Sequence, residues 1–300
     1  MISEMVKPGQ PVVSNALARP TRLPLFTRYT LVVPVAVFFA VIFLYPVAMM
    51  LLKAFTDVPA GAGHLANFAW FFNEETNVRV LWKTLHTSAL VTVCCVLVAY
   101  PVACAMVATS GTWRLAILGV VLLPFWTSMV VRNFAWVIIL QDRGVLNYVL
   151  ALAGLPPQSI LGTSTAVTIG MTQVLLPFVV LPIYSSLRSI DPSMMRAAAV
   201  LGAGPITAFF KVYLPLSLPG VTAGALLVFV LALGFYVTPA MLGSPREAML
   251  SELVITQIDR LLAWGRASAM ATCLLITTLL VLLAGAYFAR RSRNAQQSNK

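Results

Sequence analysis

Charged residues are scarce in this 300-residue chain, where only 10% of the residues are charged and 60% are apolar. A soluble domain is typically about 25% charged and about 45–50% apolar, so the composition excludes a soluble globular protein. Acidic residues are rarer than basic ones, with 9 Asp and Glu against 20 Lys and Arg. The basic residues do not cluster with aromatic ones, so we predict a lipid bilayer, and no nucleic acid, as the partner of this positive charge.

Histidine and cysteine are also few, with 2 and 4 residues. No two cysteines have C-x-x-C spacing, and neither His64 nor His86 has a metal-ligand partner at helical spacing. The sequence contains no H-E-x-x-H and no G-x-S-x-G, and the glycine-rich piece 201–206 lacks the arrangement of a phosphate loop. We therefore predict no catalytic residues, no metal and no cofactor bound by the chain itself.

Long uncharged runs are abundant, and they extend from 17 to 44 residues. A helix needs about 20 apolar residues to cross the hydrocarbon core of a bilayer. Each run holds one crossing, and the polar stretch 152–164 is excluded because its backbone cannot face lipid. We predict an all-α integral membrane protein with six transmembrane helices near 29–52, 82–108, 115–140, 165–187, 215–241 and 267–289.

The positive charges predict the orientation of these helices. With the N-terminus inside, the inner segments carry twelve basic and two acidic residues, whereas the outer segments carry seven of each. Cytoplasmic loops have an excess of Lys and Arg, so both termini are predicted to be cytoplasmic. The predicted organisation is a tail at 1–28 without signal cleavage, a transmembrane domain at 29–290 with its core at 82–289, and a tail at 291–300.

The predicted inner loop between the fourth and fifth helices has strong local signals. Asp191-Pro192 is a helix start, Ala197–Ala199 favours helix, and Gly202 is placed to end that helix in a left-handed conformation. Pro205 then opens a second short helix, which we expect to end near Leu214-Pro215. Small residues allow close approach, and apolar knobs flank them at Met194, Met195, Leu201, Phe209 and Phe210. The loop is therefore predicted to dock a partner at the cytoplasmic face.

This loop resembles the signature E-A-A-x-x-x-G-x9-I-x-L-P of the permease subunits of bacterial binding-protein-dependent ABC importers. The resemblance rests on Ala197, Ala198, Leu201, Gly202, Val212, Leu214 and Pro215. It departs at Arg196, where the family has Glu, and this reverses a charge. In that family the loop, here 188–215, is a coupling helix seated in a cleft of the cytoplasmic ATPase.

The resemblance implies an inner-membrane protein of bacteria with a type I ABC importer permease fold. It implies a second homologous permease as the partner in a heterodimer, two cytoplasmic ATP-binding subunits that carry the ATP and Mg, and a periplasmic substrate-binding protein. The chain resembles the polyamine branch of this family, which transports spermidine and putrescine, at 84–90, 100–103, 122–140, 143–147 and 242–250. Related branches for other organic cations, aminophosphonates, thiamine or ferric iron remain alternatives, as do an ion-coupled secondary transporter and a membrane scaffold.

Candidate pathway residues are harder to assign, because no acid lies inside a predicted helix. Arg132, with Asn133 beside it, is the charge within the third helix, so it must reach water, a partner or backbone carbonyls. We predict a structural or gating role with a carboxylate of this or the neighbouring subunit, with direct substrate contact or snorkelling towards the outer headgroups as alternatives. Two acids on the predicted outer side, Asp142 and Glu247, are candidates for the mouth of the pathway, although they could instead contact the binding protein. Two aromatic residues, Trp136 and Tyr236, are candidates for stacking on the substrate, although they could instead be packing residues.

Overall fold

The computed structural model describes residues 33–297, with side chains as far as residue 285. The described chain contains helices and one isolated bridge, between Gly162 and Gly243. Six helical stretches are long and apolar enough to cross a membrane, at 33–56, 75–108, 129–152, 164–188, 205–233 and 264–285. The predicted all-α fold with six membrane helices is confirmed, whereas the predicted tail 1–28 lies outside the described residues.

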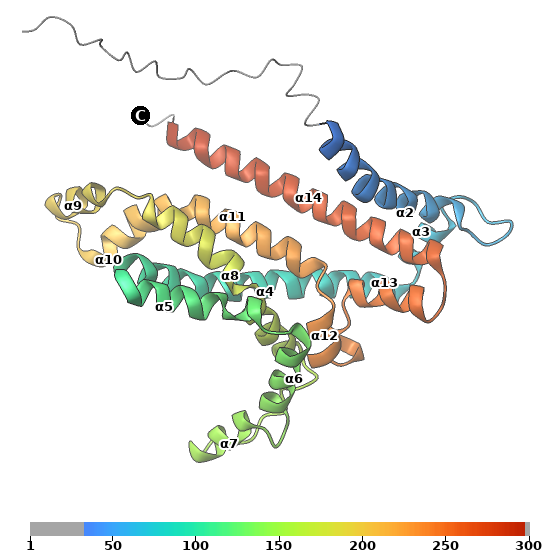
Figure 1. The fold of residues 1–300 in the computed structure, drawn as a ribbon, viewed down its shortest axis with the longest axis horizontal. Coiled ribbons are helices and arrows are strands. Elements are labelled where there is room, and N and C mark those ends of the chain that lie inside the picture. Colours follow the sequence, from blue (N-terminus) through green and yellow to red (C-terminus); the bar gives the residue numbers. More distant parts are fainter. Residues whose placement is uncertain (1–32, 298–300) are drawn as a thin grey trace, which may run out of the picture. The chain divides into compact units, whose positions relative to one another are not determined.

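The chain divides into two compact units, residues 1–49 and 50–300. In the first unit the described residues are helical from Val33 through the π turn η1 (Ala40–Leu44) into the start of α2 (Tyr45–Thr56). The helices of the second unit follow in chain order (Figure 1): α3 (Ala66–Asn73), α4 (Glu75–Ala108), α5 (Gly111–Leu122), η2 (Leu123–Trp126), α6 (Met129–Leu140), α7 (Val145–Leu152), α8 (Ser164–Arg188), α9 (Pro192–Val200), α10 (Pro205–Ala208), η3 (Phe209–Tyr213), α11 (Leu214–Leu233), α12 (Val237–Leu242), η4 (Pro245–Glu247), α13 (Leu250–Asp259) and α14 (Trp264–Gln297).

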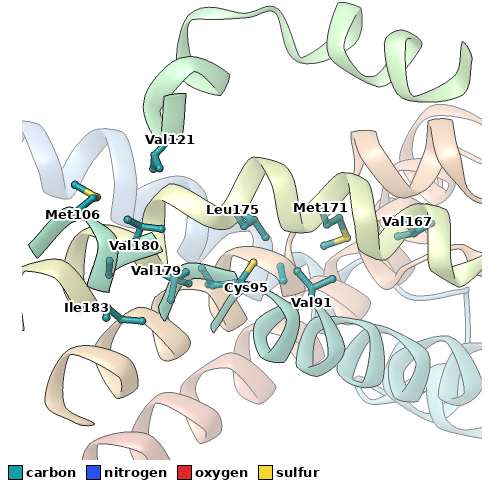
Figure 2. Packing of buried hydrophobic residues seen from close by; sticks show 14 of the residues in the cluster. Val91, Cys95, Met106, Val121, Val167, Met171, Leu175, Val179, Val180 and Ile183 are labelled. Carbon is teal, nitrogen blue, oxygen red and sulfur yellow. The ribbon is translucent and has the colours of Figure 1, made fainter. Parts of the chain in front are cut away.

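The core of the second unit is the packing of α4, α8 and α11 against one another. On α4 the fully buried residues Val91, Cys95, Ala99 and Ala103 recur every fourth position, which places them along one face of the helix. They meet a buried face of α8 that includes Val179 and other apolar side chains, as Figure 2 shows. Small residues on α4 let the helix backbones approach closely, as is common between membrane helices.

Two glycines of α11 bring that helix onto α8. A Cβ atom on Gly220 would lie 2.6 Å from the carbonyl oxygen of Pro182 and would overlap Ser186. A Cβ on Gly224, one turn later, would lie 3.1 Å from the Cα of Val179. The absence of a side chain at both positions is therefore what allows these two helices to touch.

The predicted continuous third helix at 115–140 is wrong. The structure ends α5 at Leu122, passes through η2, and is extended at Thr127 and Ser128 before α6 begins. Pro124 accounts for the change, because its missing N–H and its ring disfavour a continuous α-helix. Arg132 therefore lies in the first turn of a separate helix, close to a break in the membrane domain.

The predicted fifth helix at 215–241 is also wrong at both ends. Helical structure begins at Pro205 and runs through the π turn η3 into α11, so the short helix expected to end near Leu214-Pro215 continues instead. The N–H of Leu214 bonds to the carbonyl of Phe209, and this wider turn accommodates the proline that follows. At the other end α11 stops at Leu233, and Pro239 lies in the separate helix α12.

Helix α12 packs against both α6 and α8. A Cβ on Gly170 of α8 would lie 2.5 Å from Leu242 Cδ1 and 2.8 Å from Thr238 Cγ2. The backbone N–H of Gly162 donates to the carbonyl of Leu242 at 2.9 Å, which joins the segment before α8 to the end of α12. The interrupted helices thus bring polar residues of α6, α8 and α12 close together.

Candidate functional site

The loop between α8 and α11 begins with a capped helix, as predicted. The Asp191 carboxylate accepts a hydrogen bond from the backbone N–H of Ser193 at 2.8 Å, and Pro192 occupies the first helical position. That backbone hydrogen bond lowers the pKa of Asp191 below its ordinary value. The carboxylate is therefore charged at neutral pH and is engaged in holding the start of α9.

The same helix ends in a complete Schellman motif. The N–H of Gly202 donates to the carbonyl of Ala199, and the N–H of Ala203 donates to the carbonyl of Ala198, both at 3.0 Å. Gly202 has a φ of +81°, the left-handed conformation that a glycine adopts at little cost. The predicted glycine turn is confirmed, and it fixes the angle between α9 and α10.

The tip of this loop presents apolar side chains to its surroundings. Val200 is 87% exposed and Leu201 86%, and Ile206 and Phe210 are also exposed. Ala198 and Ala208 are buried beneath them, so the two short helices pack on each other through small side chains. Exposed apolar groups gathered on one loop indicate a docking surface.

Behind the tip, aromatic residues connect the loop to the membrane helices. The ring of Phe209 packs edge-on against Tyr100 of α4, with 5.8 Å between ring centroids, and also contacts Tyr213. The hydroxyl of Tyr100 lies 2.9 Å from Ser217 Oγ on α11. The signature residues Val212, Leu214 and Pro215 are half-buried at this junction. A displacement of the loop would therefore be transmitted to both α4 and α11.

The candidate pathway residues of α6 make two interhelical hydrogen bonds. Asn133 is buried, and its Oδ1 accepts from Thr238 Oγ1 of α12 at 3.0 Å, while its Nδ2 has no hydrogen-bond partner among the described residues. Trp136 Nε1 donates to Gln173 Oε1 of α8 at 2.7 Å. Gln173 also lines a cavity of about 580 Å³ whose other walls are apolar residues of α4, α5, η2 and α8. The structure thus gathers Asn133 and Trp136 with Thr238 and Gln173.

Among the described residues Arg132 bonds to a backbone carbonyl, and a carboxylate of the neighbouring subunit as its partner stays a prediction. Arg132 Nη2 donates to the backbone carbonyl of Thr127 at 3.0 Å, at the break between η2 and α6, and its Nε has no partner in the part of the chain that the structure describes. Among the described residues the ion pairs are Arg79 with Glu75 and Lys83 with Glu247, so no carboxylate of that part of the chain neutralises Arg132. Within this chain its observed role is to bond the unwound backbone.

The remaining candidates are Glu247, Asp142 and Tyr236. Glu247 is held in an ion pair with Lys83 of α4 at 2.7 Å, and Lys83 also donates to the carbonyl of Arg246. Asp142 is exposed after α6, and half-buried Tyr236 lies in the break between α11 and α12. Glu252, on α13, has a pKa raised by burial, an effect that Arg260 partly offsets.

Three residues of these contacts are absent from the predicted site. Gln173 and Thr238 carry no charge, so charges within apolar runs do not reveal them, although an uncharged amide in the middle of a membrane helix is a comparable signal. Lys83 pairs with a residue 164 positions away, and nothing in the sequence indicates that contact.

We expect Thr238→Val to destabilise the membrane domain by about 1–3 kcal/mol, because it leaves the buried Asn133 amide without its hydrogen-bond donor. Thr222→Val on exposed α11 surface is the matched control, since that hydroxyl bonds only to carbonyls of its own helix. Thermal unfolding of the purified protein in detergent measures both. Equal midpoints for the two variants would show that the Asn133–Thr238 bond contributes nothing.

Apolar membrane helices, interrupted near a polar cluster and joined by an exposed docking loop, define the chain as a membrane permease domain. The family of binding-protein-dependent transport system inner membrane components matches residues 96–294. The chain belongs to this family and is a multi-pass inner-membrane protein.

Curated relatives cover most of the chain. It is 34% identical over 226 residues to the spermidine/putrescine transport system permease protein PotB of Haemophilus influenzae, and the alignment covers 75% of this chain and 78% of that protein. It is 32% identical over 207 residues to PotB of Escherichia coli, with 68% and 75% covered. It is also 34% identical over 195 residues to the inner membrane ABC transporter permease protein YdcU of Escherichia coli, with 60% and 62% covered.

Solved structures show the same fold. A chain of the bacterial alginate ABC transporter, crystallised with its alginate-bound periplasmic protein, superposes with a TM-score of 0.70 at 21% identity, covering 89% of this chain and 94% of that one. A chain of the MetNI methionine ABC transporter gives a TM-score of 0.55 at 18% identity, with 75% and 97% covered. The fold is therefore that of ABC importer permeases.

Proposed function

We propose that this chain is one permease subunit of an ATP-driven importer and forms half of the transmembrane pathway for a polyamine such as putrescine or spermidine. The observation that carries the proposal is the 32–34% identity to PotB permeases over most of both chains. The ordered loop 188–215, with its exposed apolar tip, supports the coupling part of the proposal.

In this proposal the chain itself performs no catalysis. Two cytoplasmic ATPase subunits bind ATP and Mg, and one of them docks on the loop of this chain through Val200, Leu201, Ile206 and Phe210. A second, similar permease completes the pathway as a heterodimer, and a periplasmic binding protein delivers the substrate. Both termini lie in the cytoplasm, which the excess of Lys and Arg in the inner segments supports.

The pathway assignment rests on the breaks in the membrane helices. Near Thr127 and between α11 and α12 the backbone leaves the helical conformation, and such backbone is tolerated at membrane depth only inside protein or beside water. The amides of Asn133 and Gln173 would offer polar contacts there, and the apolar cavity walls would face methylene groups.

The substrate is tested by uptake competition in a strain that lacks the gene and is complemented with it. We expect complementation to restore uptake of labelled spermidine or putrescine, and a tenfold excess of either unlabelled polyamine to suppress that uptake. Choline, thiamine and an aminophosphonate serve as competitors for the related substrate classes. Suppression by one of these, and not by the polyamines, would contradict the polyamine assignment.

A further inference from the structure

The exposed charges of loop 188–215 are mostly positive, with three basic residues against one acid. Arg188, Arg196 and Lys211 are exposed, and none of them belongs to either of the ion pairs formed by the described residues. The loop has one acid, Asp191, whose carboxylate accepts the hydrogen bond that caps α9. The loop therefore presents positive charge that the described part of the chain does not neutralise.

Arg196 is the exposed charge that lies within α9, the helix that ends at the apolar tip. It lies two positions before the buried Ala198, and two residues correspond to about 200° around an α-helix. Arg196 is thus on the face of α9 opposite the packed side. Val200 lies one turn further along on that same outward face and is 87% exposed. A partner that covers the apolar tip must also cover the guanidinium.

Covering this guanidinium has an electrostatic consequence. A charge removed from water is strongly unfavourable unless it gains a partner of opposite sign and hydrogen bonds. Because no acid of the described chain lies against Arg196, that partner has to come from the protein that docks. A basic residue at that place would instead repel the loop.

We propose that the surface receiving this loop carries a carboxylate opposite Arg196, within a cleft that is apolar at its centre and acidic around Arg188 and Lys211. The inference rests on the proposed function, because it takes the docking partner to be the ATPase subunit. It adds that the ATPase of this transporter carries negative charge where this permease carries Arg196. The Glu of the family signature would instead require positive charge on the ATPase at that contact. An ATPase matched to that Glu is expected to couple poorly to this chain.

The test is ATP hydrolysis by the complete transporter in nanodiscs, stimulated by its binding protein loaded with spermidine. We expect Arg196→Glu to reduce the stimulated rate more than tenfold, and Arg196→Lys to stay within about threefold of the unaltered complex. Arg143→Glu is the matched control, because it makes the same charge change at an exposed position on the predicted outer side. The control should retain its rate within twofold.

The direction of the Arg196→Glu effect decides the inference. An unchanged or faster rate would overturn it, since the receiving surface would then be neutral or basic. If Arg196→Glu fails to assemble, Arg196→Gln replaces it, and retention of the ATPase by the permease is measured against salt concentration. The dependence on salt should be weaker for Arg196→Gln than for the unaltered loop, and equal dependence would overturn the inference. A complex with the unaltered loop that shows no stimulated hydrolysis would instead overturn the proposed function itself.

Discussion

Gly202→Glu is expected to abolish coupling, with more than a hundredfold loss of binding-protein-stimulated ATP hydrolysis by the reconstituted complex. A Cβ at position 202 would meet no atom within 4 Å, so the side chain enters the open space that a docked partner would fill. The backbone there has a φ of +81°, which costs a non-glycine residue about 1–2 kcal/mol. That cost is too small to unfold the domain, so the loss would arise at the interface.

Gly154→Glu is the matched control for this variant. Gly154 also ends a helix with a positive φ, of +71°, and has no atom within 4 Å of an added Cβ. The surrounding hydrogen bonds form the same motif, because the N–H of Leu155 donates to the carbonyl of Leu150 at 2.9 Å. The two changes are therefore equal in strain and charge, and they differ in the surface on which they lie. Equal loss of coupling in both variants would contradict a docking role for Gly202.

Gly220→Leu should have the largest effect on stability. An added Cβ would lie 2.6 Å from the Pro182 carbonyl and overlap Ser186, and since Pro182 contributes backbone, rotation of a side chain cannot relieve the contact. The helices α8 and α11 would have to separate along the main core. We expect a loss of about 3 kcal/mol or more, which corresponds to roughly 6–12 °C in the thermal midpoint.

Gly119→Leu provides the comparison for that prediction. Gly119 lies in α5, is exposed, and has no atom within 4 Å of an added Cβ. The same change there should alter the midpoint by no more than about 3 °C, because it relieves a helix-weakening glycine without creating a clash. Differential scanning fluorimetry on both purified variants measures the contrast. If Gly220→Leu and Gly119→Leu have the same thermal midpoint, close packing at Gly220 does not stabilise the protein.

Local chemistry made the docking loop predictable. Three features of the loop each depend on residues within five positions of one another: the cap at Asp191, the helix start at Pro192 and the turn at Gly202. A short stretch of sequence is therefore enough to predict each of them. The membrane helix α8 was placed within one residue at each end for a related reason. Its apolar length is set by the bilayer and hardly depends on which neighbours pack against it.

The helix breaks and the polar contacts required tertiary information. Thr127 and Gly234 both lie within long uncharged runs, so a hydropathy profile joins segments that the structure separates. The position of α12 depends on Gly170, which lies more than 60 residues earlier in the chain and leaves space for Thr238. The bond from Arg132 to the carbonyl of Thr127 also depends on the helix break, because the sequence does not show that this carbonyl is unwound and within reach.

The most direct test of the central claim is uptake of labelled spermidine into proteoliposomes that contain this permease, its partner permease and the ATPase. ATP and Mg are enclosed inside, and the loaded binding protein is added outside. We predict accumulation that requires enclosed ATP, is unaffected by collapse of ion gradients, and is lost in Gly202→Glu while Gly154→Glu retains it. Accumulation without ATP, driven by an ion gradient and insensitive to Gly202→Glu, would contradict the account.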